Sequence, residues 1–249
     1  MSQWLFDLGN SRLKCAPLLD DGRLGEMQAL AHDEAAFIEN LHALLPAQAD
    51  VACLSSVASP TLTAMVRDAL MARFRVLSFA RTQPALAGVR IAYAEPEKFG
   101  VDRFLTLLAA RARGPQAWLI AGVGTALTLD LLDADGRHHG GRIAPSPQLM
   151  RAALHRAAAQ LPTNGGDYAE FATDTPDALA SGCDGAAAAL IERSLQQARE
   201  RFGREPALLL HGGGSDALRT LLPQATFAPA LVLEGLAAWA RAGIRIPAC

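Results

Sequence analysis

The first residues that could do chemistry lie at the start of the chain, in residues 5–14, which read LFDLGNSRLK. An apolar run delivers the carboxylate of Asp7, and the Gly9-Asn10 pair after it tolerates positive φ and so favours a tight hairpin turn. Such a turn directs backbone N–H groups outward. With Ser11 and Lys14 they could hold a phosphate beside a metal ion attracted by Asp7. The alternative is an ordinary β-hairpin whose Asp precedes the turn.

A second Gly-containing turn, GVGTA at residues 122–126, occurs in the second half of the chain. Its glycine, Gly124, corresponds to Gly9, and with that alignment Gly122 takes the position of Asp7. Both halves then read as strand, Gly turn, strand, Asp-Gly turn, strand, which favours an internal duplication over a chance likeness. Thr125 offers a hydroxyl and an N–H to a phosphate, although a Thr at a strand start also reflects β-propensity alone.

The sequence Gly-Val-Asp-Arg at residues 100–103 lies near the start of a helix expected at residues 97–113. A carboxylate beside a guanidinium suits a general base, Asp102, next to an anion anchor, Arg103. Two solvated residues on an amphipathic helix are the alternative. Tyr93, one of two tyrosines, precedes this segment and could donate a hydrogen bond to a substrate.

Composition limits the class of protein. The 249 residues are 51% hydrophobic with a formal net charge of −2, which indicates a globular protein and argues against a general nucleic-acid binder. No apolar run reaches the ~18 residues of a membrane helix, so we expect no membrane partner and a cytoplasmic location. The four cysteines lie far apart in the sequence and are expected to be buried thiols.

Hydrophobic periodicity predicts strands that alternate with helices, and therefore a largely covered sheet in each half. The domain boundary is expected near residue 115, giving domains 1–115 and 116–249. After the opening strand that carries Asp7, strands are expected at residues 13–19, 23–30, 51–57, 75–79, 118–123 and 207–211, and a loop leads to a short run at residues 90–93. Helices are expected at residues 34–45, 61–74, 97–113, 148–160, 176–202, 215–222 and 231–242.

Taken together, these motifs resemble the type III pantothenate kinases of the acetate and sugar kinase, Hsp70 and actin superfamily. The resemblance rests on the order and spacing of residues 7–14, Tyr93 with 100–103, 124–126, 140–145, and Thr175 seven residues before Gly182. It implies an α/β fold of the duplicated ribonuclease H-like (actin-like ATPase) type. In that fold two subdomains, each a mixed sheet flanked by helices, enclose a nucleotide cleft.

The resemblance also implies an activity, the transfer of the ATP γ-phosphate to the terminal hydroxyl of pantothenate. The product is 4'-phosphopantothenate, and the reaction is the first committed step of coenzyme A biosynthesis. By the same implication Asp102 is the general base, and Thr175 contacts pantothenate across a homodimer interface. Asp7 is the Mg²⁺ ligand expected from the opening hairpin. The implied ATP-binding residues are Asp7, Leu8, Gly9, Asn10, Ser11, Arg12, Leu13, Lys14 and Thr125. The other implied pantothenate-binding residues are Tyr93, Gly100, Val101, Asp102 and Arg103.

Two positions depart from the family pattern. The family usually has an Asp, associated with a monovalent cation (K⁺ or NH₄⁺), where this chain has Gly122, so the need for that cation is in doubt. Residues 140–145 read GGRIAP, and the family has a Gly after this Pro, where the chain has Ser146. A Ser is tolerated there unless the position needs a positive φ.

Two rival functions remain open at this point. One is a regulatory or accessory protein that keeps the fold without catalysis, since some relatives resembling this chain were first described as accessory transcription factors. The other is a kinase of the same superfamily for a sugar or another small alcohol. Retention of Asp7, Asp102 and Arg103 argues against the first, and Tyr93 with Thr175 fits pantothenate better than a sugar.

Overall fold

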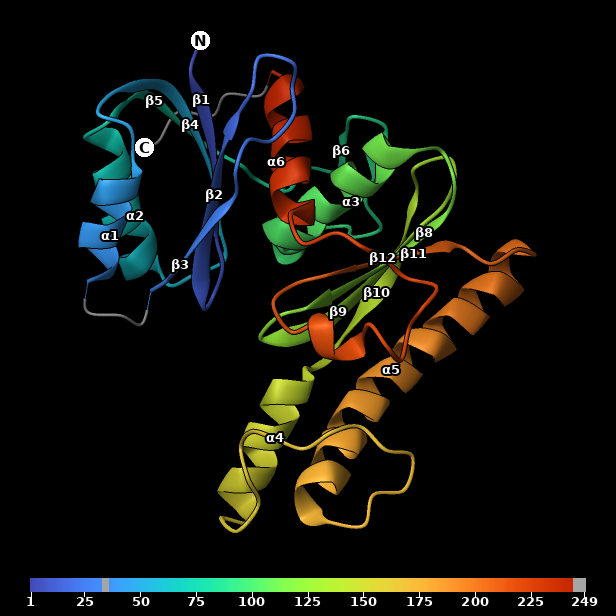
Figure 1. Cartoon of the computed structure of the whole chain (residues 1–249). Helices are drawn as coiled ribbons and strands as arrows, with labels where there is room; N and C mark the ends of the chain where they lie inside the picture. Colours follow the sequence, from blue (N-terminus) through green and yellow to red (C-terminus); the bar gives the residue numbers. More distant parts are fainter. Residues whose placement is uncertain (33–35, 244–249) are drawn as a thin grey trace. The chain divides into compact units, whose positions relative to one another are not determined.

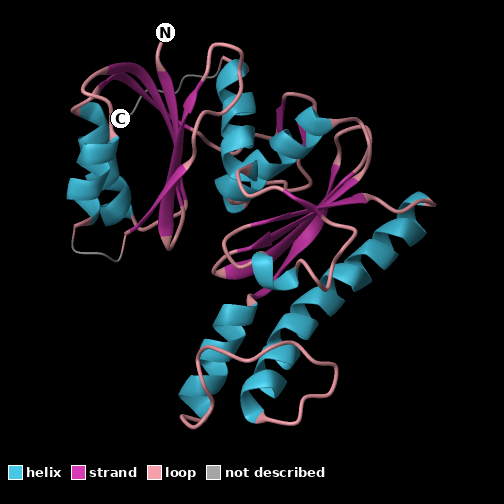
Figure 2. Cartoon of the chain, viewed as in Figure 1, coloured by secondary structure: helices cyan, strands magenta, loops and turns pink. Residues whose placement is uncertain are grey.

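Two five-stranded sheets form the frame of the chain, and each belongs to its own unit (Figure 2). The computed structural model describes residues 1–32 and 36–243. Unit 1 comprises residues 1–114 together with the segment that begins at Ala230, and unit 2 comprises residues 115–229.

The elements of unit 1 follow in chain order. They are β1 (Gln3–Leu8), β2 (Arg12–Leu18), β3 (Gln28–Ala31), α1 (Phe37–Leu44), β4 (Ala49–Ser56), α2 (Pro60–Met71), β5 (Phe74–Phe79), β6 (Ala85–Leu86), β7 (Val89–Arg90), the 3-10 turn η1 (Pro96–Lys98), α3 (Val101–Arg113) and α6 (Leu231–Arg241). The elements of unit 2 are β8 (Trp118–Val123), β9 (Ala126–Leu132), β10 (His138–Pro145), α4 (Pro147–Ala157), α5 (Thr175–Phe202), β11 (Ala207–His211), η2 (Asp216–Leu218) and β12 (Thr226–Phe227).

The two sheets have the same topology. The strand order is β3-β2-β1-β4-β5 in unit 1 and β10-β9-β8-β11-β12 in unit 2. In each sheet the first three strands in sequence are antiparallel neighbours and the last two add in parallel. This repeat confirms the duplicated α/β fold that the two Gly hairpins predict.

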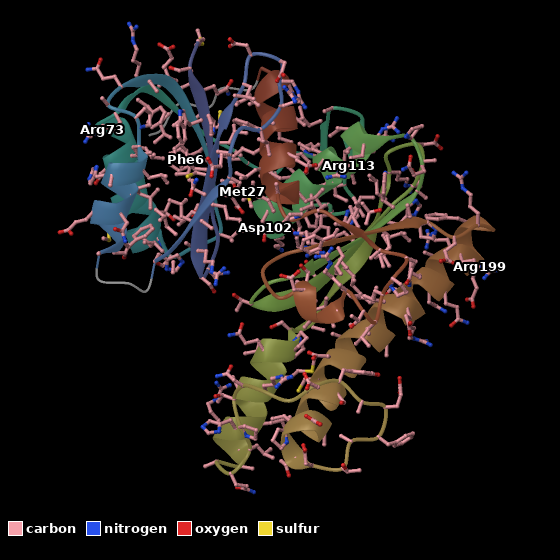
Figure 3. All side chains as sticks on the ribbon, viewed as in Figure 1. Phe6, Met27, Arg73, Asp102, Arg113 and Arg199 are labelled. Carbon is pink, nitrogen blue, oxygen red and sulfur yellow. The ribbon has the colours of Figure 1, made fainter. Side chains whose placement is uncertain are left out.

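Helices cover both faces of the sheet in unit 1, with α1 and α2 on one face and α3 and α6 on the other (Figure 1). Side chains alternate between the faces along a strand. Phe6 and Leu8 pack into the core with α1 and α2, as Figure 3 shows for Phe6, so Asp7 faces the side of α3 and α6. In unit 2, α5 packs against β8 and β9, and α4 packs against α5.

The last helix, α6, lies with unit 1, whereas the sequence placed it in the domain 116–249. The reason is its packing against α3. Gly235 lets the two backbones approach so closely that a Cβ there would collide with the carbonyl of Leu105. The chain therefore returns to the first unit after completing the second.

Several shorter elements also differ from expectation. The predicted helix at residues 97–113 divides into η1 and α3, because Gly100 has an extended backbone (φ −53°, ψ 134°). Only one 3-10 turn forms in the predicted helix 215–222, and the two-residue strand β12 was not expected.

Some predictions reach beyond the described part of the chain. The predicted start of the first helix at Glu34 and the expected burial of Cys249 lie outside the described residues. Cys15, Cys53 and Cys183 are buried as expected. None of the helices in residues 1–32 and 36–243 is long and apolar enough to cross a membrane.

Candidate active site

Asp7 is the penultimate residue of β1 and accepts a hydrogen bond of 3.0 Å from the hydroxyl of Ser55 on β4. Burial raises the pKa of the Asp7 carboxyl to about 6. The hydrogen bond from Ser55 opposes this rise, repulsion by Asp102 adds to it, and the charge of Lys14 opposes it. The carboxylate is therefore held where its negative charge is incompletely compensated by the protein, as expected for a group that meets a cation.

The turn after β1 is more open than the sequence predicts. The N–H of Gly9 donates to the carbonyl of Arg12 at 3.0 Å, and Leu8 pairs with Leu13 across the hairpin. Neither Gly9 nor Asn10 has a positive φ, so the expected tight turn is wrong. Residues 9–12 form the turn, and the side chains of Asn10, Ser11 and Arg12 are exposed.

Asp102 lies in the first turn of α3, on the face of the unit 1 sheet away from α1 and α2 (Figure 3). Its Oδ1 accepts a hydrogen bond of 2.8 Å from the N–H of Arg103. A Cβ at Gly100 would stand 2.7 Å from that oxygen, so a glycine there leaves room for the carboxylate to fold over the helix start. The N–H groups of a first helical turn stabilise negative charge in this place.

An aromatic ring that the sequence analysis missed joins two of the predicted substrate residues. Phe99 is buried, its ring centroid lies 4.8 Å from that of Tyr93, and the Cζ of Arg103 lies 4.7 Å from the Phe99 ring centroid. The carbonyl of Phe99 also accepts a hydrogen bond of 2.7 Å from Thr82. Phe99 therefore fixes the orientation of Tyr93 and Arg103 together, and cation–π attraction contributes to this.

In unit 2 the turn at Gly124 is the tighter of the two, with its N–H donating to the carbonyl of Ala126 at 3.0 Å. Thr125 is exposed at this turn, and its carbonyl accepts a hydrogen bond of 3.0 Å from the hydroxyl of Ser146. Ser146 is buried, caps α4 by accepting from the N–H of Leu149, and has φ −69°. The Gly-to-Ser departure is therefore unstrained, and it ties the turn to α4.

Thr175 is the first residue of α5 and is exposed. The preceding residue, Asp174, caps the helix by accepting from the N–H of Asp177 at 2.9 Å. The structure thus places Asp7, Tyr93 and residues 100–103 in unit 1, and Thr125 and Thr175 in unit 2.

The residues near Asp7 fit a magnesium ion that shares its coordination with a nucleotide. Within residues 1–32 and 36–243, no group of three or more His, Cys, Asp or Glu side chains could hold a metal ion. Asp7 and Asp102 are near enough to repel each other electrostatically. One or two carboxylates, completed by phosphate oxygens and water, are what Mg²⁺ uses beside phosphates.

Comparison with solved structures defines the class of protein first. A Campylobacter jejuni protein, whose name assigns it to the Baf family of transcriptional activators, matches with a TM-score of 0.61 and 17% identity over 97% of this chain and 100% of its own. The activator of 2-hydroxyisocaproyl-CoA dehydratase from Clostridium difficile, with ADPNP bound, matches with a TM-score of 0.54 and 9% identity over all of both chains. These likenesses concern the fold alone, which is that of the actin-like ATPases and sugar kinases.

The family follows from sequence comparison. A family model described as type III pantothenate kinase matches residues 4–197. A Stenotrophomonas maltophilia (strain K279a) protein named Type III pantothenate kinase is 60% identical over 240 residues, covering 96% of this chain and 98% of its own length. The chain belongs to the type III pantothenate kinase family, as the motifs predict, and is an enzyme.

Proposed function

We propose that this chain transfers the γ-phosphate of ATP to the terminal hydroxyl of pantothenate, with Asp102 as the general base. The observation that carries the proposal is the position of Asp102 at the start of α3, close enough to Asp7 for the two charges to interact. Phosphoryl transfer needs positioned groups and neutralised phosphate charge more than covalent chemistry. A carboxylate for the hydroxyl proton and a second carboxylate for a cation supply those needs.

ATP binding is proposed for residues 7–14, with Thr125 as a further contact. The exposed residues 10–12 of the turn can offer backbone N–H groups and the Ser11 hydroxyl to phosphate oxygens. Asp7 would hold Mg²⁺ on the nucleotide, and Mg²⁺ supplies positive charge that offsets the charge of the phosphates. Asp102 then takes the proton of the attacking hydroxyl.

Pantothenate binding is proposed for Tyr93 and residues 100–103. Arg103 is buried and stacked on Phe99, so its guanidinium is held in one orientation and can pair with the pantothenate carboxylate. Tyr93, whose ring also lies against Phe99, can donate a hydrogen bond from its hydroxyl to a polar group of the substrate.

Three further features belong to the proposal. The enzyme works as a homodimer in which Thr175 contacts the pantothenate bound to the partner copy. It acts in the cytoplasm, and it takes part in coenzyme A biosynthesis. Exposed apolar side chains on α4 and on the segment before α5 support the dimer.

The test is a coupled ADP-release assay with ATP and Mg²⁺ that compares pantothenate with glucose, glycerol and acetate. We expect turnover with pantothenate alone among the four. The absence of pantothenate-dependent turnover at millimolar ATP would contradict the kinase proposal. If the protein bound ADP without any turnover, the regulatory alternative would be favoured. Turnover with glucose or glycerol but not pantothenate would identify a kinase for another alcohol.

A further inference from the structure

The two sheets allow a comparison within this chain between the surroundings of Asp7 and those of its counterpart. In unit 1, Asp7 on β1 pairs in register with Lys14 on β2 and with Ser55 on β4. All three face away from the core shared with α1 and α2, because the alternate residues Phe6 and Leu54 pack into that core. The carboxylate thus stands between an ammonium group and a hydroxyl group.

In unit 2 the same positions hold different chemistry. Gly122 on β8 pairs in register with Thr128 on β9 and with His211 on β11. These residues face away from the core shared with α5, which receives the alternate residues Ala121 and Val123. Unit 1 has the carboxylate of Asp7 beside the hydroxyl of Ser55. At the matching positions, unit 2 has Gly122, which lacks a side chain, beside the imidazole of His211.

The imidazole occupies the space that a side chain at position 122 would need. A Cβ at Gly122 would lie 2.7 Å from the Nε2 of His211, 2.9 Å from its Cε1, and 2.8 Å from the Oγ1 of Thr128. These separations are shorter than Cβ contacts in real proteins, so an aspartate there requires the histidine ring to move. With the ring of His211 in this position, residue 122 has to be a glycine.

The residues here do not fit the monovalent cation that relatives are expected to bind through an aspartate at this position. K⁺ is held by several oxygen ligands, whereas this position presents one hydroxyl oxygen, that of Thr128, and the ring nitrogen of His211. The other carboxylate of the same strand face, Asp130, is buried and hydrogen-bonded to the Nε2 of His138 at 3.0 Å. Position 122 thus offers no charge to a cation.

We propose that His211 takes the place of the cation and its carboxylate ligand, so that this enzyme binds nucleotide and turns over without a monovalent cation. A carboxylate with K⁺ has no net charge and presents a positive end to a ligand. An imidazole ring likewise carries an N–H donor, which can meet a negatively charged phosphate. His211 ends β11, and its neighbour Gly122 lies two residues before the turn glycine Gly124. The inference rests on the proposed role of Thr125, at that turn, in ATP binding.

The first experiment measures ADP binding by calorimetry and pantothenate turnover in chloride salts of K⁺, NH₄⁺, Na⁺ and tetramethylammonium. We expect the ADP affinity and the turnover to agree within about twofold in all four salts. A loss of about tenfold or more without K⁺ or NH₄⁺ would overturn the inference. Cation-independent ADP binding without turnover would support the inference while counting against the proposed function, so the two failures are distinguishable.

The second experiment changes the residues at positions 122 and 211, singly and together. His211→Ala is expected to weaken ADP binding roughly tenfold in every salt, because a hydrogen bond to a charged group is lost. Gly122→Asp alone is expected to lower the Tm, because its side chain meets the ring. The double variant Gly122→Asp/His211→Ser restores a carboxylate with room beside it, so K⁺ is expected to raise its Tm and its ADP affinity.

His139→Ala is the matched control, because His139 lies in the same unit and pairs with Asp133 at 2.7 Å, away from position 122. Its ADP affinity is expected to equal that of the wild type. A folded double variant that is indifferent to K⁺ contradicts the inference. If the double variant does not fold, His211→Ala decides, since wild-type ADP affinity in that variant would remove the proposed role of the ring.

Discussion

Asp7, the proposed Mg²⁺ ligand, is held against its own electrostatic preference. Burial and the charge of Asp102 raise its pKa to about 6, although Ser55 and Lys14 stabilise the charged form. A carboxyl whose pKa in the folded state is above its ordinary value binds its proton more tightly when folded. The resulting stability is complete below about pH 4 and is lost as the pH rises through about 6.

Asp7→Asn is therefore expected to stabilise the metal-free protein at pH 7.5. The rise of the Asp7 pKa to about 6 corresponds to ~3 kcal/mol, and the solvent contact of the half-buried side chain reduces our expectation to about 1–2 kcal/mol. Urea unfolding in EDTA at pH 4 and pH 7.5 measures the difference, which is expected to vanish at pH 4. Asp21→Asn is the control, because hydrogen bonds from Arg23 lower the pKa of Asp21 and its loss cannot stabilise the protein at pH 7.5. No gain from Asp7→Asn would contradict the assigned charge balance.

Asp102→Asn tests the base. The substitution keeps the size of the side chain and an oxygen for the N–H of Arg103, so the fold and the ADP affinity are expected to remain. Loss of the proton acceptor is expected to lower kcat by about 10²-fold or more. Glu97→Gln, an exposed residue in the preceding 3-10 turn, is the matched control and is expected to retain wild-type kcat. An unchanged kcat in Asp102→Asn would remove the assignment.

At the scale of elements, the position of Asp102 depends on how α3 packs against α6. At Gly235 the two helices approach so closely that a Cβ there would overlap the backbone of Leu105. Gly235→Ala is expected to cost about 2–4 kcal/mol of unfolding free energy, because a helix rather than a flexible side chain must move. The same movement displaces the start of α3, so kcat is expected to fall as well.

Gly185→Ala in α5 is the control for this prediction. Its Cβ would make an ordinary contact, 3.5 Å from Tyr168, so the substitution is expected to be neutral or to stabilise by about 0.5–1 kcal/mol through helix propensity. Chemical denaturation of both variants separates packing from propensity. Equal stability of the two would show that the helix crossing adapts.

Strongly periodic elements could be predicted from the sequence. The helix expected at residues 176–202 appears as α5 over Thr175–Phe202, and the strand at residues 118–123 appears as β8. Elements whose limits depend on tertiary contacts could not be predicted, such as the break before α3 at Gly100, where the carboxylate of Asp102 needs the space of a side chain. Strand β12 has only two residues, too few to show the alternation of apolar and polar side chains that predicts a strand.

At the scale of the whole chain, the duplication could be read from two Gly hairpins and two Asp-Gly turns, whereas the partners of the site residues could not. Ser55, Phe99 and His211 are brought to Asp7, Arg103 and Gly122 by strand register and ring packing. Local sequence patterns do not encode register between strands about fifty or ninety residues apart. The hairpin motifs indicate where the proposed sites lie, and strand pairing in the sheet determines which residues lie beside them.

The proposed homodimer belongs to this scale too. Phe171, in the segment before α5, has 96% of its surface exposed, and Leu154 on α4 and Tyr168 are also among the exposed large apolar side chains. Large apolar patches on a surface mark contacts between proteins, and a side chain as exposed as Phe171 is a candidate for one. Thr175, proposed to reach the partner's pantothenate, lies four residues after Phe171.

Phe171→Ser is therefore expected to weaken the dimer roughly 30-fold or more, as removal of a central aromatic anchor does. Sedimentation equilibrium measures the dissociation constant. Met71→Ser, at an exposed apolar residue on α2 of unit 1, is the control and is expected to leave it unchanged. Because Thr175 would be lost with the partner, the KM for pantothenate is expected to rise in Phe171→Ser at low enzyme concentration and to recover at high concentration. A monomeric wild type, or a KM that does not depend on enzyme concentration in this variant, would contradict the role of Thr175 across the interface.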